Sequence, residues 1–278
     1  MKKTIITVAT TGAFPTKEHN PNVPLTPKEI AAQVHECWQA GAAVAHLHMR
    51  DDEGKGTMDK EKFKETVGLI RSQCDIILNL TTSGDLKATD ETRMAHLIEL
   101  KPEMASYDAG SMNWMHSGLF LNPPQFLEEL GHTMQENQVK PEIEIFDAGM
   151  VYNALYYLKK GVLTAPLHFQ FVLGAAGGTA ATVENLVYLK SLIPQDATWS
   201  ALGIGAGHLP ILYATLALGG HVRVGMEDNV LYAKDRPARS NAEFVARAAR
   251  LIREANQEVA SPTEAAAILN LKQRGSLT

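Results

Sequence analysis

The sequence repeats one pattern along its length, in which a short run of β-branched and apolar residues is followed by a longer segment with helical periodicity. Strands that alternate with helices in this way predict a parallel sheet whose faces are covered by the helices. Eight such units fit within about 250 residues, which favours a closed (β/α)8 TIM barrel over an open doubly wound sheet. The predicted strands cover residues 4–9, 43–48, 75–80, 104–107, 141–146, 167–173, 198–202 and 221–225.

We expect one α/β domain over residues 1–278, because no linker, charge block or low-complexity segment divides the chain. The first helix has a defined start, since Thr26 is suited to cap it, Pro27 occupies its first turn and Glu29 completes a capping box. The last long helix is predicted at 241–258. Residues 261–278 follow it as a C-terminal helical tail, which we place at a subunit interface as a hypothesis.

The composition argues against several classes of partner. The formal net charge is −5 and no basic tract is present, so nonspecific binding to nucleic acid is not expected. No apolar run reaches the roughly 18 residues of a membrane span, and the short apolar stretch after Lys3 is predicted as a strand rather than a signal peptide. The two cysteines, Cys37 and Cys74, fall in helical patterns, which indicates a reducing, cytoplasmic environment without a disulfide framework.

His46 and His48 lie two residues apart in a predicted strand, so both imidazoles point to the same side of it. Two imidazoles and one carboxylate make a three-ligand zinc site whose fourth position is open to water or substrate. Glu227, just after the last predicted strand, is the candidate carboxylate. The alternative is that two of the ten histidines fall at this spacing by chance and satisfy hydrogen bonds in the core.

Charged residues also occur in or beside the predicted strands. Glu142 and Glu144 share one face of the fifth strand, where a buried carboxylate is costly unless it is paired or bound to a cation. They could serve a site or form salt bridges in the barrel core. A turn after the last strand could bring both Glu227 and Asp228 to the mouth. Arg223 precedes them and could orient Asp228, bind an anion, or be a solvated charge at the strand end.

Active sites of TIM barrels lie at the carboxyl ends of the strands. Polar or glycine-rich clusters recur at these positions, and although each one alone also suits a turn, together they predict a site at one barrel mouth. The clusters are residues 10–12, His46 with His48, residues 82–85, Ser106, Glu144, the loops after residues 173 and 202, and Glu227 with Asp228.

Several longer segments resemble the β-keto acid cleavage enzymes, the family that includes the 3-keto-5-aminohexanoate cleavage enzyme. The clearest is the run from Ala40 to Asp51, which reads Ala-Gly-Ala-Ala-Val-Ala-His-Leu-His-Met-Arg-Asp. The others lie at residues 6–13, 24–30, 82–84, 110–113, 141–147 and 221–229, so the resemblance runs along nearly the whole chain. Together these segments are far more specific than any one of them.

The resemblance implies a zinc-containing (β/α)8 barrel, usually a homotetramer, that converts a β-keto acid and acetyl-CoA into acetoacetate and a new acyl-CoA. In such a reaction the metal acts as a Lewis acid and a carboxylate takes the C2 proton of the keto acid. Glu144 is assigned to the site in preference to Glu142 because it lies nearer the mouth. Carried over by position, the zinc ligands are His46, His48 and Glu227, the base is Asp228 held by Arg223, and the keto acid contacts are Thr82, Gly84, Asp85 and Ser106.

Two positions depart from the aminohexanoate enzyme. That enzyme has a glutamate for the amino group of its substrate where this chain has Phe14, and an aromatic ring cannot form the charge-assisted hydrogen bond. Phe14 could instead contact an apolar tail or stack on a quaternary ammonium group. Asp85 replaces a small residue in the Thr-Ser-Gly loop, which changes the contact made there. We therefore expect the same reaction class with a substrate other than 3-keto-5-aminohexanoate.

Two other functions fit part of the pattern. A metal-dependent barrel aldolase or hydrolase would use the same ligands and turn over without CoA. A noncatalytic binder of small molecules would keep its affinity after loss of Asp228 and would show no turnover. The aspartate beside a candidate metal-binding glutamate argues against the binder.

Overall fold

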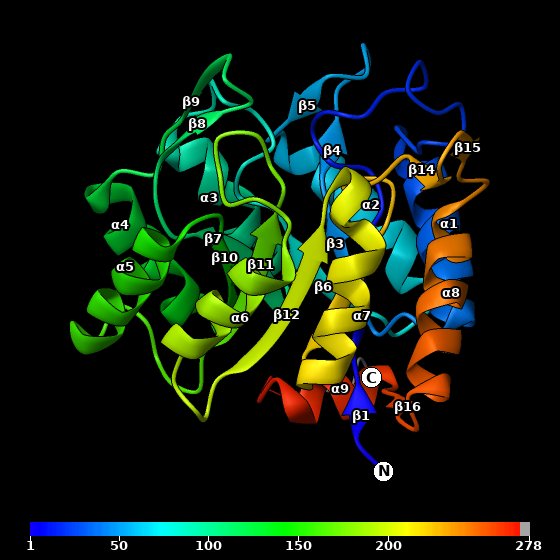
Figure 1. Cartoon of the computed structure of the whole chain (residues 1–278). Helices are drawn as coiled ribbons and strands as arrows, with labels where there is room; N and C mark the ends of the chain where they lie inside the picture. Colours follow the sequence, from blue (N-terminus) through cyan, green and yellow to red (C-terminus); the bar gives the residue numbers. More distant parts are fainter. Residues whose placement is uncertain (273–278) are drawn as a thin grey trace.

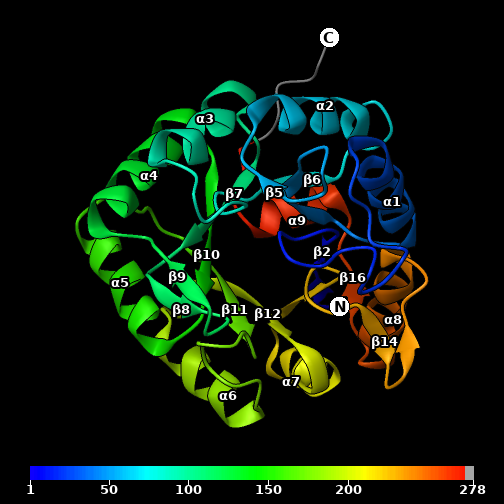
Figure 2. The same cartoon turned by 90° about the horizontal axis from the view of Figure 1, so that it is seen from above.

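The computed structural model describes residues 1–272. Within them, eight parallel strands close into a barrel in which each strand pairs with the next one along the chain, and the last pairs with the first. Figure 2 shows the helices as a ring around the barrel. The predicted (β/α)8 TIM barrel is therefore confirmed. The barrel strands are β2 (Ile6–Ala9), β3 (Val44–Leu47), β6 (Ile77–Leu80), β7 (Met104–Asp108), β10 (Lys140–Ile145), β11 (His168–Leu173), β12 (Thr198–Gly203) and β13 (His221–Val224).

Each barrel strand is followed by a helix. The first helix begins as its sequence predicts, because the Thr26 side chain accepts a hydrogen bond from the Glu29 backbone and the Glu29 side chain returns to the Thr26 backbone. None of the described helices is both long and apolar enough to cross a membrane. The helices are α1 (Pro27–Ala40), α2 (Lys60–Arg71), α3 (Asp90–Leu100), α4 (Pro124–Asn137), α5 (Ala148–Lys159), α6 (Val183–Leu192), α7 (His208–Leu218), α8 (Asn241–Glu254) and α9 (Pro262–Ile268), with a 3₁₀ turn, η1 (Gly205–Gly207), before α7.

The apolar core lies between the barrel and its helices, whereas the inside of the barrel is polar. Side chains alternate along a strand between these two environments. In β10, Ile143 and Ile145 belong to the hydrophobic core, while Glu142 and Glu144 contact polar groups inside the barrel. Branched apolar side chains usually fill a TIM barrel, so a polar interior marks a site. Other buried polar residues on the barrel strands are Thr7, His46, Asn79, Ser106, Asp108, His168, Gln170, Ser200, His221 and Arg223.

Three short antiparallel strand pairs extend the carboxyl ends of the barrel strands, at the top of Figure 1. One follows β3, one lies in the long connection between β7 and α4, and one follows β13. They build up the end of the barrel at which the predicted site residues lie. The pairs are β4 (Met49–Arg50) with β5 (Gly56–Thr57), β8 (Met112–Trp114) with β9 (Gly118–Phe120), and β14 (Leu231–Ala233) with β15 (Arg236–Pro237).

The opposite end of the barrel is covered by segments from both ends of the chain. β1 (Lys3–Thr4) pairs with β16 (Glu258–Val259), and α9 lies beside them in Figure 1. The helix predicted over 241–258 ends at Glu254, because Glu258 belongs to this strand pair. The predicted tail therefore packs on the barrel as far as Leu271, and its residues 273–278 lie outside the described part of the chain. The tail and the strand starts share an apolar cluster of Ile5, Ala43, Val44, Ile77, Met104, Ala260, Ala265 and Leu269.

Candidate active site

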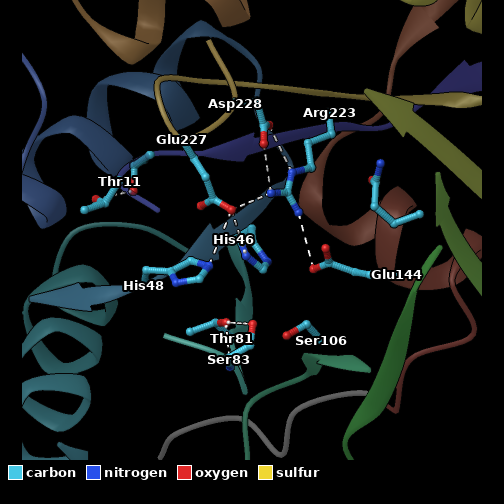
Figure 3. A network of polar contacts seen from close by, with 12 residues as sticks. Thr11, His46, His48, Thr81, Ser83, Ser106, Glu144, Arg223, Glu227 and Asp228 are labelled. Atoms are coloured by element: carbon cyan, nitrogen blue, oxygen red, sulfur yellow. Dashed lines mark hydrogen bonds and ion pairs between the residues drawn. The ribbon is translucent and has the colours of Figure 1, made fainter. Parts of the chain in front are cut away.

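Three residues with metal-ligating side chains converge at the barrel mouth (Figure 3). His46 lies on β3, His48 follows it, and Glu227 follows β13. Nε2 of each histidine lies 3.4 Å from Oε1 of Glu227, and ligand atoms of all three residues lie within 4.8 Å of one another. Oε2 of Glu227 is buried and has no hydrogen-bond partner within residues 1–272. Two imidazoles and a carboxylate with an unpartnered oxygen fit a zinc ion that keeps one coordination position open.

The two histidines have different electrostatic surroundings. Burial acts to lower the pKa of both imidazoles, and for His48 burial prevails. For His46 the negative charges of Glu227 and Glu142 prevail and raise the pKa to about 10. A metal binds the neutral imidazole, so an ion in this site has to displace a proton from His46.

A turn after β13 brings Glu227 and Asp228 to the mouth together, as expected from the sequence. Gly225 has a positive φ of 143°, and a side chain there would collide with the backbone of Ala9. The backbone N–H of Glu227 donates to the Ala9 carbonyl at 3.2 Å. The backbone N–H of Met226 donates to Oδ1 of Asn241 at 2.7 Å. The turn is thus fixed against β2 and α8.

Arg223 connects the acidic residues of the mouth. Its side chain is 3% exposed and donates to Oε1 of Glu227 at 2.5 Å and to both carboxylate oxygens of Asp228 at 3.2 Å. Nη1 lies 3.5 Å from Oε1 of Glu144. Burial raises the pKa of Asp228 to about 6, although the charge of Arg223 acts in the opposite direction. Asp228 is therefore an oriented carboxylate with a pKa close to neutrality, as a general base requires.

The two glutamates of β10 have different partners. Glu142 has Oε2 3.5 Å from Nδ1 of His46 and accepts a hydrogen bond from Nδ2 of Asn79. Burial acts to raise the pKa of Glu142, but the contact with His46 and nearby positive charges lower it to about 2. Burial raises the pKa of Glu144 to about 8, and the charge of Asp108 adds to that effect. Glu142 is thus positioned to orient a histidine, a function that sequence reasoning did not assign to it.

Hydroxyl groups line the side of the mouth away from Arg223 (Figure 3). Oγ of Ser106 accepts a hydrogen bond from the Thr82 backbone at 3.0 Å, while the Thr82 hydroxyl donates to the Ser106 carbonyl at 3.0 Å. The hydroxyl hydrogen of Ser106 can therefore be donated to a ligand. Beside it, the hydroxyls of Thr81 and Ser83 lie 3.2 Å apart. Sequence reasoning missed Thr81, although it continues the inward alternation that Asn79 begins on β6.

The loop after β6 is held by a buried arginine. Nε of Arg93 donates to the Thr82 carbonyl at 2.6 Å. Gly84 packs closely against β5, since a Cβ added to it would lie 3.1 Å from the Thr57 carbonyl oxygen and 3.1 Å from Sδ of Met58. Oδ1 of Asp85 accepts a hydrogen bond from the Lys87 backbone at 2.9 Å, so this carboxylate stabilises a turn of its own loop. These contacts fix the position of the loop beside Ser106.

Asp108 is a buried carboxylate of the mouth that sequence reasoning did not select. It ends β7 and is the register partner of Glu144 on β10, so both side chains point inward. Burial raises the pKa of Asp108 to about 6, while the charge of Arg93 and a hydrogen bond with Ser83 oppose that change. Its Oδ2 has no hydrogen-bond partner among the described residues. The alternation of Ser106 and Asp108 along β7 is the signal that identifies it.

Phe14 lies on the loop between β2 and α1, and 58% of its surface is exposed. Its ring centroid is 5.4 Å from that of His19. The same loop packs against Glu227 at Gly12 and against β5 at Ala13. The predicted specificity residue therefore lies on a loop that touches a candidate metal ligand.

Comparisons with known proteins show which chains and which fold this protein resembles. A family model described as beta-keto acid cleavage enzyme matches residues 3–271. The 3-keto-5-aminohexanoate cleavage enzyme of Fusobacterium nucleatum subsp. nucleatum is 43% identical over 98% of this chain and 100% of its own length. A 3-oxoadipate:acetyl-CoA acetyltransferase of Cupriavidus necator is 35% identical over 96% of this chain and 94% of its own. The apo structure of ObcA has a TM-score of 0.82 at 20% identity over 90% of this chain and 66% of that one, which shows a shared fold.

Proposed function

This chain belongs to the β-keto acid cleavage enzyme family, and on that premise we propose that it condenses a β-keto acid with acetyl-CoA to give acetoacetate and a new acyl-CoA. The observation that carries the proposal is the convergence of His46, His48 and Glu227 beside Asp228, which Arg223 orients. A candidate metal-binding triad next to a held carboxylate suits deprotonation beside a carbonyl, because a metal can stabilise the enolate and the carboxylate can take the proton.

Zinc is the proposed metal, and His46, His48 and Glu227 would hold it. Two imidazoles and one carboxylate are a ligand set of catalytic zinc, and the unpartnered Oε2 of Glu227 fits the approach of a cation. Zinc bound there would supply a Lewis acid that stabilises the negative charge developing on the ketone oxygen of the keto acid. Glu142, 3.5 Å from His46, would keep that imidazole in the ligating orientation.

Asp228 is the proposed base for the C2 proton of the keto acid. With its pKa near 6, it is mostly ionised at neutral pH, and both its oxygens are held by Arg223. Glu144 approaches the same guanidinium from the other side. Because burial raises the pKa of Glu144 to about 8, this group retains a proton at neutral pH and does not repel an anionic substrate.

The keto acid would lie against the loop after β6. Its carboxylate would accept the free hydroxyl hydrogen of Ser106, and Thr82 would fix that hydroxyl through their two mutual hydrogen bonds. The backbone at Gly84 and Asp85 would line the same subsite. Phe14, in place of a carboxylate, favours a substrate tail without a primary ammonium group.

The bond changes balance without a covalent enzyme intermediate. The C2 carbanion attacks the thioester carbonyl of acetyl-CoA, forms a C–C bond and releases CoA. CoA then attacks the original ketone carbonyl, and cleavage of its bond to C2 gives the new acyl-CoA and the carbanion of acetoacetate. Asp228 returns its proton to that carbanion. The cysteines are not needed as nucleophiles, since Cys37 is buried in α1 and Cys74 follows α2, outside the barrel.

The resemblance also supports a homotetramer that acts on small molecules in the cytoplasm, and we include this assembly in the proposal.

A coupled assay of the zinc-analysed protein tests the function. Acetyl-CoA is supplied with a panel of β-keto acids, and both acetoacetate and new acyl-CoA are followed. We expect acetoacetate only when acetyl-CoA is present, and its loss in His46→Ala and Asp228→Asn. Product formed without CoA would instead support a metal-dependent aldolase or hydrolase. Ligand binding without turnover across a broad panel would support a noncatalytic binder.

A further inference from the structure

Arg50 is a buried arginine that the proposed reaction does not use. Its surface is 2% exposed, and within residues 1–272 its guanidinium donates to backbone carbonyls alone. Nε donates to Gly12 at 2.8 Å, and Nη1 donates to Gly54 at 2.8 Å. Nη2 donates to Pro15 at 2.7 Å and to Thr11 at 3.2 Å. Three of the four acceptors, Thr11, Gly12 and Pro15, lie in the first part of the loop between β2 and α1, so this single side chain fixes the start of that loop.

The loop that Arg50 fixes is in close contact with Glu227, a candidate metal ligand. Gly12 has a φ of +63°, and a Cβ built on it would lie 2.6 Å from Cγ and 3.2 Å from Cβ of Glu227. The loop backbone therefore forms the wall behind the Glu227 side chain. A shift of Gly12 would therefore change the space that the Glu227 side chain occupies.

Arg50 is also close to His48 along the chain, because its strand, β4, begins directly after that histidine. It lies two residues after His48, and its strand, β4, pairs with β5. Gly56 of β5 packs in turn against Ala13 of the loop and against the backbone of Gly84. The strand pair is thus wedged between the loop after β2 and the loop after β6. A displacement of Arg50 would therefore disturb both the loop after β2 and the loop after β6.

A guanidinium suits this position better than an ammonium group. Its planar fork presents five N–H donors in fixed directions, whereas lysine has one compact donor centre on a flexible stem. The Arg50 charge is also close enough to Glu227 for their attraction to be felt, because Glu227 acts to raise the pKa of Arg50 while burial lowers it.

We propose that Arg50 is a positioning residue that holds Gly12 against Glu227, and so keeps the third ligand in place for a divalent cation at the barrel mouth. The inference rests on the proposed zinc centre. It assigns a function to the arginine of the His-Leu-His-Met-Arg segment that is separate from metal ligation and from proton transfer. The hydrogen bonds from Arg50 also position Phe14, which lies in the sequence between the bonded carbonyls of Gly12 and Pro15.

The test compares Arg50→Lys with a matched control, Arg71→Lys. Arg71 also donates to a backbone carbonyl, that of Ile76 at 2.6 Å, but it lies at the end of α2 and not at the mouth. Zinc affinity is measured by competition with a chelator, and amide hydrogen exchange is followed over residues 10–17. We expect Arg50→Lys to weaken zinc binding by about tenfold or more, as loss of a supporting contact to a metal ligand does, and to speed exchange in this loop.

The control variant is expected to lose thermal stability while its zinc affinity stays within about twofold of wild type. Unchanged zinc affinity in Arg50→Lys, or equal losses in the two variants, would overturn the inference. In case Arg50→Lys does not fold, exchange in the wild-type protein with and without zinc gives an independent result. Zinc should slow exchange at Gly12 and Ala13, and no change there would also overturn the inference. A wild-type protein that binds no zinc would refute the proposed metal centre itself, before any variant is compared.

Discussion

Gly12 and Glu227 are in such close contact that a Cβ added to Gly12 would lie 2.6 Å from Cγ of Glu227. The two residues come from opposite ends of the chain and meet because β2 and β13 are neighbours in the closed barrel. The absence of a side chain at Gly12 is therefore part of the geometry of the proposed metal centre.

Substitution of Gly12 by alanine should weaken zinc binding as well as the fold. The left-handed φ of +63° alone costs a residue with a Cβ about 1 kcal/mol, and the contact with Glu227 adds a displacement of the ligand. Gly161→Ala is the matched control, because Gly161 has φ +78° and no atom within 4 Å of the added Cβ. Chelator competition and thermal unfolding should show that only Gly12→Ala loses zinc affinity. Equal affinities in the two variants would show that Gly12 does not support the ligand.

The functions of the two β10 glutamates can be separated by amide substitution. Glu142→Gln should weaken zinc binding by about 10–100-fold, because the contact with His46 at 3.5 Å loses its charge. Glu144→Gln should leave zinc affinity within a few fold, because Glu144 contacts Arg223 and its raised pKa keeps it mostly protonated, so the amide changes little of its charge. Measured zinc affinities in the reverse order would place the supporting carboxylate at Glu144.

Asp228→Asn should remove the proposed base while the metal remains bound. The amide keeps the shape of the side chain beside Arg223 but cannot accept a proton, so kcat should fall by about 10²–10⁴-fold. Zinc content per chain should not change, because Asp228 is not one of the three converging ligands. Retention of more than about a tenth of wild-type kcat would assign the base to another residue.

The raised pKa of Glu144 should appear in the pH dependence of stability. In the folded protein the pKa is about 8, above the ordinary value of 4.5, so between these values the native state holds a proton that the unfolded chain has lost. The stabilising contribution is present below pH 4.5 and is lost as the pH rises through about 8. In metal-free protein, the Tm of Glu144→Gln relative to wild type should therefore increase by at least about 3 °C between pH 5 and pH 9. Glu129→Gln, at an exposed site on α4, is the control, and a parallel pH profile for both variants would contradict the assignment.

Much of the barrel could be predicted because its strands carry their own signal. The predicted runs 75–80 and 167–173 are rich in β-branched and apolar residues and are followed by turn residues, and the structure places strands at 77–80 and 168–173. The end of α8 has a local signal that the prediction over 241–258 did not use, because Asn256 adopts the left-handed φ of 53° with which asparagine can end a helix. The strand position of Glu258 has no such local signal, since it depends on pairing with Lys3, at the other end of the chain.

The site residues that could be predicted are those that alternate inward along a barrel strand. His46 and His48 were identifiable by their spacing, and the same rule, if applied to β6 and β7, identifies Thr81 and Asp108. Alternation does not separate Glu142 from Glu144, because both point inward and their difference lies in which neighbours they meet across the barrel. The four contacts of Arg50 are to backbone carbonyls, which leave no pattern in the sequence.

Phe14 should determine which keto acid the enzyme accepts. The resemblance implies a glutamate at this position in the aminohexanoate enzyme, and a carboxylate there would form a charge-assisted hydrogen bond with a primary ammonium group. Phe14→Glu should therefore raise kcat/KM for 3-keto-5-aminohexanoate by at least about tenfold, because such a bond contributes roughly 1.5–3 kcal/mol. The same variant should lose activity toward the substrate of the wild-type enzyme, since the exposed ring is removed.

The matched control for this exchange is Leu119→Glu, which adds the same charge at another exposed apolar residue, on β9. If the new carboxylate acts through its position on the loop that packs on Glu227, only Phe14→Glu gains the amino substrate. An equal gain in both variants would mean that the added charge acts at long range, and that effect should disappear at high ionic strength. No gain in Phe14→Glu would mean that the substrate tail lies elsewhere at the mouth, and Phe14 would lose its assignment as the specificity residue.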